Sequence, residues 1–177
     1  MQKITTRLKN LTCFTPKRFS GFTLLELLVV FTIIGIISTV SIASFVSYSR
    51  GATLKQAELD VSSLLHDAKS RAQSQRKPVS CTGTLQGYRV DICGLSGSSC
   101  QTPNTFTLSV VCTNATTLIT TKQLPTNVSF ISSSSSSSSF TFQTVTNGVI
   151  GAGSVILSGT DGQKAITVEQ SGVISKE

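Results

Sequence analysis

The chain has 177 residues, a formal net charge of +7, one histidine and eight acidic residues. This length allows one ordinary domain plus an appended segment. So few acids and histidines exclude most catalytic and metal-binding constellations, and we expect no enzyme activity, no cofactor and no metal. The charge is not an argument for a nucleic-acid partner, because residues 1–21 hold five lysines and arginines and no acid, which leaves ten basic against eight acidic side chains, or +2.

Residues 1–21 are basic and polar and contain Pro16, so they offer no surface that could pack into a core. Residues 22–46 are overwhelmingly apolar. A short basic segment before an apolar run is typical of membrane orientation, with the positive end kept in the cytoplasm. As a helix the apolar run would extend about 37 Å, enough to cross a hydrocarbon core of roughly 30 Å with some tilt. We therefore expect a disposable leader at 1–21 and a transmembrane helix at 22–50.

The helical pattern continues over residues 51–77, where apolar residues recur every three or four positions. These residues form one stripe: Leu54, Ala57, Val61, Leu64, Leu65, Ala68 and Ala72. The pattern predicts an amphipathic half of the same helix that packs on a sheet. Gly51 disfavours helix and is a possible kink, and Pro78 disfavours helical geometry at Lys77 and so ends the element.

Residues 78–177 change to short β-like runs separated by turn residues, the pattern of an antiparallel sheet. The chain is therefore predicted to be an α+β protein. Asn147-Gly148 and Asp161-Gly162 predict turns, and the eight serines at 132–139 have nothing to bury and predict a flexible loop. The expected strands are Val79–Thr82, Tyr88–Cys93, Phe106–Cys112, Thr117–Leu124, Val128–Ile131, Phe140–Val145, Ser154–Leu157, Ala165–Glu169 and Val173–Ser175.

Four cysteines remain if the leader, with Cys13, is removed: Cys81, Cys93, Cys100 and Cys112. An even number in an exported domain favours disulfides, and four cysteines allow three pairings that sequence alone does not separate. We prefer Cys93 with Cys100, which closes a short Gly/Ser loop, and Cys81 with Cys112 around it. Free buried thiols are the alternative.

The most informative segment runs from Lys17 through Gly21, Phe22 and Glu26 into the apolar run. It resembles the signal of type IV prepilins and of type II secretion pseudopilins. The resemblance implies a type IV pilin-like fold and cleavage between Gly21 and Phe22 by a prepilin peptidase, with N-methylation of Phe22. It also implies other pilin or pseudopilin subunits as partners, and a place in the bacterial inner membrane as a single-pass protein with its C-terminal domain outside the cytoplasm.

Glu26 requires a compensating role, because an ionisable side chain within a membrane-spanning helix costs at least about 2.5 kcal/mol. Cleavage after Gly21 would create a cationic α-amino group on Phe22, and burying that cation without an anion would also be costly. In the prepilin family the glutamate is thought to pair with the N-terminus of a neighbouring subunit. We therefore expect Glu26 to act in assembly.

An ordinary secretory signal is the rival interpretation, since Ser41-Ile42-Ala43 could serve as a small-residue cleavage site. The acid within the apolar run and the continuing stripe beyond residue 54 argue against it.

Within the family the C-terminal region most resembles the FimT and GspH group of minor pilins and pseudopilins, through Ala68-Lys69-Ser70-Arg71 and Lys77-Pro78-Val79. DNA-binding members of that group carry arginines after the closing glycine, whereas Val173, Ile174 and Ser175 follow Gly172 here. A cluster of Arg71, Arg76, Lys77 and Arg89 would be the alternative basis for DNA binding. Three functions stay open: a structural pilin or pseudopilin, a DNA-binding minor pilin, and a membrane-anchored exported domain that never polymerises.

Overall fold

The structure is a computed structural model that describes residues 21–95, 100, 102–146 and 148–177, with the backbone alone for 39–43. The chain divides into two compact units, one up to Ser41 and one from Ile42 to Glu177. The described residues form one helix and nine strands. The fold is thus α+β, with an N-terminal helix and antiparallel sheets, as the sequence predicts.

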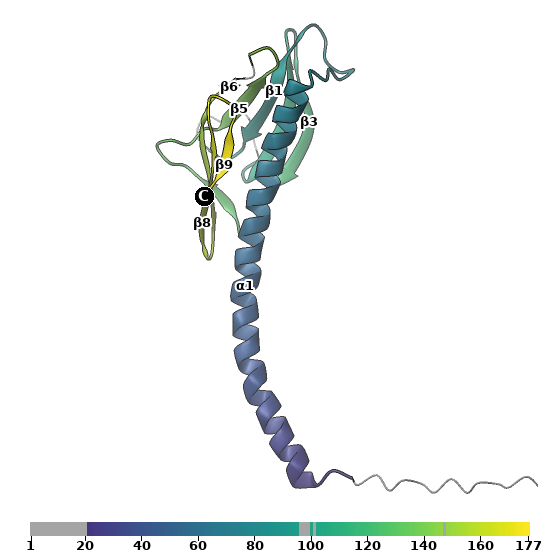
Figure 1. The fold of residues 1–177 in the computed structure, drawn as a ribbon, viewed down its shortest axis with the longest axis vertical. Coiled ribbons are helices and arrows are strands. Elements are labelled where there is room, and N and C mark those ends of the chain that lie inside the picture. Colours follow the sequence, from purple (N-terminus) through teal and green to yellow (C-terminus); the bar gives the residue numbers. More distant parts are fainter. Residues whose placement is uncertain (1–20, 96–99, 101, 147) are drawn as a thin grey trace, which may run out of the picture. The chain divides into compact units, whose positions relative to one another are not determined.

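Helix α1 spans Leu24–Gln73 and passes through Gly51 without ending (Figure 1). It stops four residues before the predicted end at 77. Gln75 has a φ of 51°, and the Arg76 N–H turns back to donate to the Arg71 carbonyl at 3.3 Å. This reversal is a common way to end a helix, because it satisfies carbonyls of the last turn.

The strands belong to two antiparallel sheets. The first has the order β3-β2-β1-β5-β6 and the second the order β4-β7-β8-β9. Their bounds are β1 Leu85–Ile92, β2 Thr105–Cys112, β3 Thr116–Gln123, β4 Ser129–Ile131, β5 Ser139–Gln143, β6 Val149–Ile150, β7 Gly153–Gly159, β8 Gly162–Val168 and β9 Ile174–Lys176.

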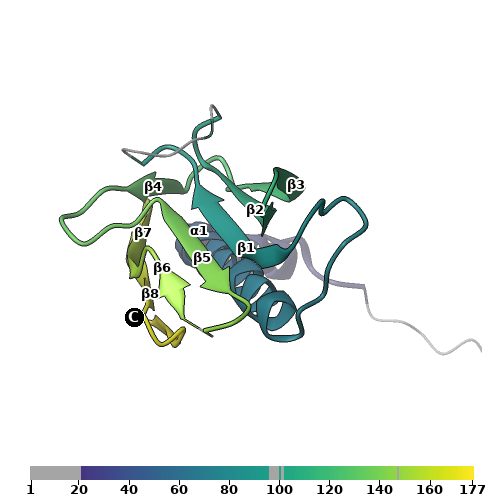
Figure 2. The same ribbon diagram turned by 90° about the horizontal axis from the view of Figure 1, so that it is seen from above.

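Both sheets contribute to one core together with the second half of α1. Figure 2 shows β1 and β5 crossing α1, with β7 and β8 beside them. All seven apolar residues of the predicted helical stripe are buried, from Leu54 to Ala72. Facing them are alternate strand residues such as Tyr88, Val90, Phe140 and Ile166. The prediction of an amphipathic helix half that packs on a sheet is therefore confirmed.

The predicted strand Val79–Thr82 is wrong. This segment is a turn in which the Cys81 N–H donates to the Pro78 carbonyl at 3.0 Å, and Val79 is fully exposed. Pro78 lacks a backbone donor and so favours a turn over a strand in a ladder. The two-residue strand β6 was missed, because a strand so short carries no alternation to recognise.

The turn predicted at Asp161-Gly162 lies one residue earlier, where Thr160 and Asp161 connect the paired residues Gly159 and Gly162 of β7 and β8. Of the other predicted turn, Asn147 lies outside the described residues, and the Gln143 N–H closes that hairpin on the Gly148 carbonyl at 3.0 Å.

The serine run 132–139 is a loop as far as Ser138, and main-chain hydrogen bonds tie it to both sheets. The Ser137 N–H donates to the Ser154 carbonyl, the Ser154 N–H donates to the Ser135 carbonyl, and the Ile92 N–H donates to the Ser138 carbonyl. Ser139 already belongs to β5. Composition does not reveal these bonds, because main-chain groups, which every residue carries, make them.

Candidate processing and assembly site

The Gly21–Phe22 peptide bond lies just before α1, and both residues are exposed. A Cβ placed on Gly21 would meet no atom within 4 Å. The bond therefore lies in an open, non-helical segment that a peptidase could bind in extended form.

Thr23 caps the start of the helix. The Glu26 N–H donates to the Thr23 hydroxyl at 3.2 Å, and the Leu27 N–H donates to the Thr23 carbonyl at 3.1 Å. Thr-x-x-Glu is the spacing of a capping box, in which a threonine at the N-cap and an acid three residues later stabilise a helix start. Sequence reasoning missed this role of Thr23, although the spacing could have revealed it.

Glu26 is exposed and lies in the first turn of α1. An acid at this position is favoured by the partial positive charge of the helix N-terminus. Among the described residues, Glu26 forms no ion pair. Its carboxylate is thus oriented near the helix start and available to a cation.

The first half of α1 exposes a large apolar surface. Isolated exposed apolar residues are ordinary, but a contiguous patch on this scale indicates contact with lipid or with another protein. Over the residues whose side chains are described, no helix meets the length and hydropathy needed to cross a membrane. The exposed apolar residues up to residue 46 include Phe22, just before α1, and Leu24, Leu25, Leu27, Leu28, Val29, Val30, Phe31, Ile33, Ile34, Ile36, Ile37, Phe45 and Val46 within it.

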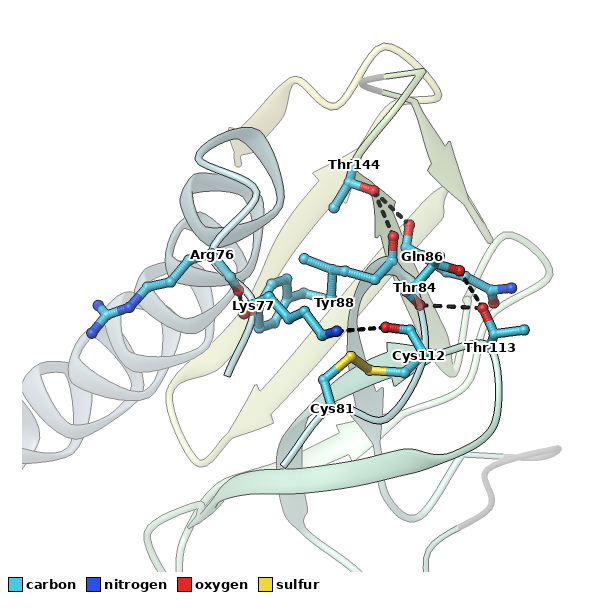
Figure 3. Close-up of a disulfide and its surroundings, with 11 residues drawn as sticks. Arg76, Lys77, Cys81, Thr84, Gln86, Tyr88, Cys112, Thr113 and Thr144 are labelled. Atoms are coloured by element: carbon cyan, nitrogen blue, oxygen red, sulfur yellow. Dashed lines mark hydrogen bonds between the residues drawn. A yellow bond between two sulfur atoms is a disulfide. The ribbon is translucent and has the colours of Figure 1, made fainter. Parts of the chain in front are cut away.

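The four domain cysteines form two disulfides, Cys81–Cys112 and Cys93–Cys100. This is the pairing that we preferred from the sequence. Cys81–Cys112 joins the turn after α1 to the end of β2 (Figure 3), and Lys77 Nζ donates to the Gly83 carbonyl at 2.6 Å in the same segment. Disulfides are typical of domains exposed to an oxidising compartment.

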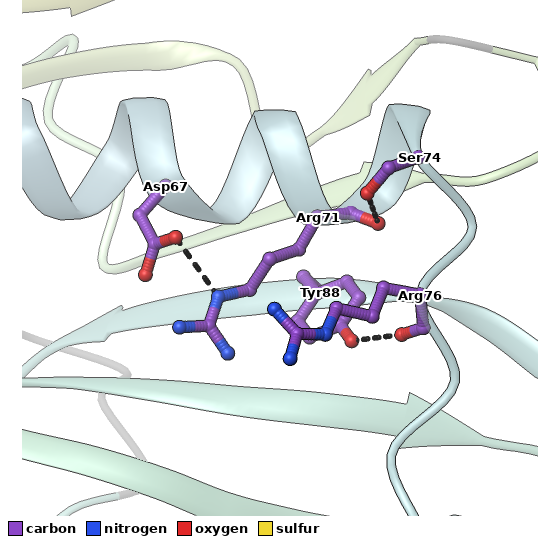
Figure 4. Close-up of polar contacts among 5 residues, drawn as sticks. All are labelled: Asp67, Arg71, Ser74, Arg76 and Tyr88. Atoms are coloured by element: carbon purple, nitrogen blue, oxygen red, sulfur yellow. Dashed lines mark hydrogen bonds and ion pairs between the residues drawn. The ribbon is translucent and has the colours of Figure 1, made fainter.

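The expected cluster of four cations does not form a free basic surface. Arg71 Nε donates to Asp67 Oδ1 at 2.9 Å (Figure 4), and this hydrogen bond raises the pKa of Arg71. Arg89 Nε donates to Asp91 Oδ2 at 2.9 Å. Arg89 follows the core residue Tyr88 in β1 and so points to the opposite face of the sheet. Nucleic-acid binding therefore gains no support from this arrangement.

Two polar groups on α1 are buried without a hydrogen-bond partner among the described residues: Glu58 Oε2 and Ser62 Oγ. The cation nearest to that carboxylate is Lys55, whose Nζ lies 4.0 Å away. Within the same residues, no three His, Cys, Asp or Glu side chains gather as metal ligands. His66, which sequence reasoning did not assign to a site, is exposed on α1.

Comparison with known proteins adds one match. Residues 16–42 match the family model of the prokaryotic N-terminal methylation motif. No curated protein and no solved structure gives a significant match to the chain. The matched segment contains Gly21, Phe22 and Glu26, the exposed start of α1 described above. Residues 16–42 therefore carry a type IV prepilin-like methylation motif, and this match does not extend to the domain at 78–177.

Proposed function

We propose that this chain is a precursor that a prepilin peptidase cuts between Gly21 and Phe22, after which the Phe22 amino group is methylated. The match to the methylation motif is the observation that carries this proposal. Support also comes from the open, exposed segment around the scissile bond, which ends where Thr23 starts the helix.

The mature subunit then assembles through α1. Apolar side chains exposed along the first half of this helix require lipid before assembly and neighbouring helices afterwards. Glu26 pairs with the Phe22 amino group of an adjacent subunit, because neither charge is stable alone in apolar surroundings. Residues 22–50 thus serve first as a single-pass anchor in the inner membrane and then as the filament core.

The domain at 78–177 faces outward from the filament, outside the cytoplasm, which agrees with its two disulfides. We assign the chain to the minor pilins or pseudopilins of a type IV pilus or type II secretion system, closest to the FimT and GspH group. A DNA-binding minor pilin and a membrane-anchored domain that never polymerises are the remaining alternatives, and no contact in the structure favours either.

Mass spectrometry of the protein purified from a host with a prepilin peptidase tests processing. We expect a chain that begins at a methylated Phe22, and accumulation of the full-length precursor in a host without the peptidase. The Gly21→Ala variant is a clean probe, because its Cβ meets nothing in the structure and any loss of cleavage reports on the peptidase. A chain that still begins at Met1, or one that begins near Ser44, would rule the proposal out.

Assembly needs a separate test. Glu26→Gln keeps the size of the side chain and removes its charge, so we expect normal cleavage and loss of the subunit from sheared filaments. Thr23→Val is the matched control: it removes the capping hydroxyl but keeps the acid, and it should still assemble. Equal incorporation of Glu26→Gln and wild type would exclude the charge-pairing mechanism and favour the non-polymerising alternative.

A further inference from the structure

The face of the first sheet that points away from α1 is hollowed. The hollow has a volume of about 660 Å³, within the range of small-ligand sites. It lies among residues of β1, β2, β5 and β6 and of the adjoining turns. Its lining residues are Thr84, Leu85, Gln86, Arg89, Val111, Thr141, Gln143, Val145, Thr146 and Ile150.

Gly87 lies beside the hollow, at a position where the sheet has no side chain. Val111 and Gln143 are the register partners of Gly87 on the two neighbouring strands, and both line the hollow. A Cβ at Gly87 would lie 2.3 Å from the Phe142 carbonyl oxygen, so only glycine fits this close approach. The missing side chain is therefore fixed by the backbone.

A bulge in β1 shapes the same place. The register between β1 and β2 shifts between Leu85 and Gly87, and bulges often re-aim side chains beside functional sites. Thr144, which is buried, holds the bulge: its hydroxyl lies 3.2 Å from both the Leu85 and the Gln86 carbonyl oxygens (Figure 3). The bulge beside the hollow is thus held in place by a buried side chain, that of Thr144.

Arg89 supplies the charge. Its side chain is 32% exposed, whereas that of its partner Asp91 is 7% exposed. Asp91 binds Nε and so orients the guanidinium, and the terminal nitrogens keep donors for a second partner. Among the described residues that line the hollow, Arg89 is the single charged group.

The remaining lining combines two kinds of surface. Hydroxyls and carboxamides of Thr84, Thr141, Gln86 and Gln143 offer neutral hydrogen bonds, and the aliphatic side chains of Val111, Val145 and Ile150 offer an apolar wall. One cation beside an apolar wall fits an anion of single charge that carries hydrocarbon. Inorganic phosphate, which has more charge and no hydrocarbon, would leave that wall unused.

We propose that this hollow binds a carboxylate carried on a short aliphatic chain, with the carboxylate on the Arg89 guanidinium and the chain against Val111, Val145 and Ile150. The carboxylate could belong to the C-terminus of a peptide or to a free small acid, and the chemistry of recognition is the same. This site is separate from cleavage and assembly and does not depend on either.

Fluorescence anisotropy with the full chain in detergent tests the site. The probes are a labelled peptide that ends in leucine with a free carboxylate, the same peptide as an amide, and unlabelled butanoate and inorganic phosphate as competitors. We expect the free acid to bind at least tenfold more tightly than the amide, since charge-assisted hydrogen bonds are lost in the amide. Binding of butanoate in isothermal titration calorimetry, with no binding of the labelled peptide, would assign the site to a free acid.

Three variants locate the binding. Arg89→Gln should weaken the binding of the free-acid peptide about tenfold or more. Arg76→Gln is the matched control, because it removes the same charge from an exposed position outside the hollow. This control should leave the affinity for the peptide unchanged. Val145→Glu is the second probe, because Arg89→Gln leaves Asp91 unpaired and could unfold the domain. Val145 lies at the rim of the hollow and is 86% exposed. An acidic side chain at this position should weaken the binding of the carboxylate severalfold. Equal binding of acid and amide, indifference to Arg89→Gln and Val145→Glu, or equal competition by phosphate would overturn the proposal.

Discussion

The Tyr88 hydroxyl donates a hydrogen bond to the main-chain carbonyl of Arg76 (Figure 4). The bond ties β1 to the segment just after α1, at the point where helical carbonyls lack partners within the helix. Tyr88 is buried, so this one hydrogen bond satisfies both the Tyr88 hydroxyl and the Arg76 carbonyl. The junction between helix and sheet therefore depends on this side chain.

Tyr88→Phe should destabilise the domain by about 1 kcal/mol, because the ring remains packed while the hydrogen bond is lost. Urea unfolding followed by far-UV circular dichroism measures this change. Thr141→Val, which alters a residue on the other face of the sheet, is the control. An unchanged unfolding midpoint for Tyr88→Phe would show that water replaces the lost bond without cost.

The same residue predicts a pH dependence. Burial raises the pKa of Tyr88 above its ordinary value of 10.0, against the lowering effect of Arg71 and Arg76. A raised folded-state pKa contributes stability that is fully present below the unfolded pKa and is lost as pH rises through the folded pKa. The stability of the wild type should therefore decline above about pH 10, and Tyr88→Phe should lack this component. Urea midpoints of both proteins from pH 8 to 11 provide the comparison.

The two disulfides should contribute unequally. Cys81–Cys112 spans 31 residues and Cys93–Cys100 spans seven, and loop-closure entropy makes the longer cross-link more stabilising by about 1 kcal/mol. Replacing each pair by alanine and comparing thermal midpoints tests the ranking. A larger loss for the Cys93–Cys100 pair would mean that native packing around the short loop, rather than chain entropy, decides the effect.

Glu58→Gln should stabilise the domain by about 1 kcal/mol, because a buried carboxylate with incomplete pairing costs free energy that a neutral amide of the same size avoids. Glu58 is 2% exposed, and one of its oxygens has no hydrogen bond within the described structure. Lys55→Gln removes the distant cation and should have the opposite sign. Denaturant unfolding of both variants gives the two signs, and destabilisation by Glu58→Gln would indicate that the charge is compensated.

Gly51→Ala should also stabilise the subunit, by up to about 1 kcal/mol, since alanine favours helix over glycine. Gly51 lies within α1, and an added Cβ would meet no atom within 4 Å. Circular dichroism at 222 nm during thermal unfolding measures the gain. If the stabilised variant no longer enters filaments, then bending at Gly51 is part of assembly.

The periodic features of this fold were predictable from the sequence. A stripe such as Leu54, Val61 and Leu65 recurs at helical spacing whatever packs against it, so the helix and its buried face were predictable. Val79–Thr82 failed because composition favoured a strand while Pro78 imposed a turn. The main-chain bonds of the serine run were not predictable, since they depend on where Ser154 and Ile92 lie in the sheets.

The two candidate sites differ in the same way. Gly21, Phe22 and Glu26 are close in sequence, so their pattern was visible without a structure. The hollow beside Gly87 was not, because it is made from strands brought together by register: Val111 and Gln143 become neighbours only in the sheet. The bulge that shapes it leaves no periodic signal. Of the residues that line the hollow, Arg89 was singled out from the sequence, but as part of a possible DNA-binding cluster.

The serine run connects β4 of the second sheet with β5 of the first, so its length decides which residue begins β5. Its main-chain bonds do not depend on the hydroxyls, so substitutions within 132–135 should be tolerated, whereas the number of residues should not change freely. Removing one residue next to Ser139 would shift β5 by one position and turn Phe140 and Phe142 from the core to the solvent. The segment with the least varied composition in the domain is thus one whose length sets the alignment of its neighbours.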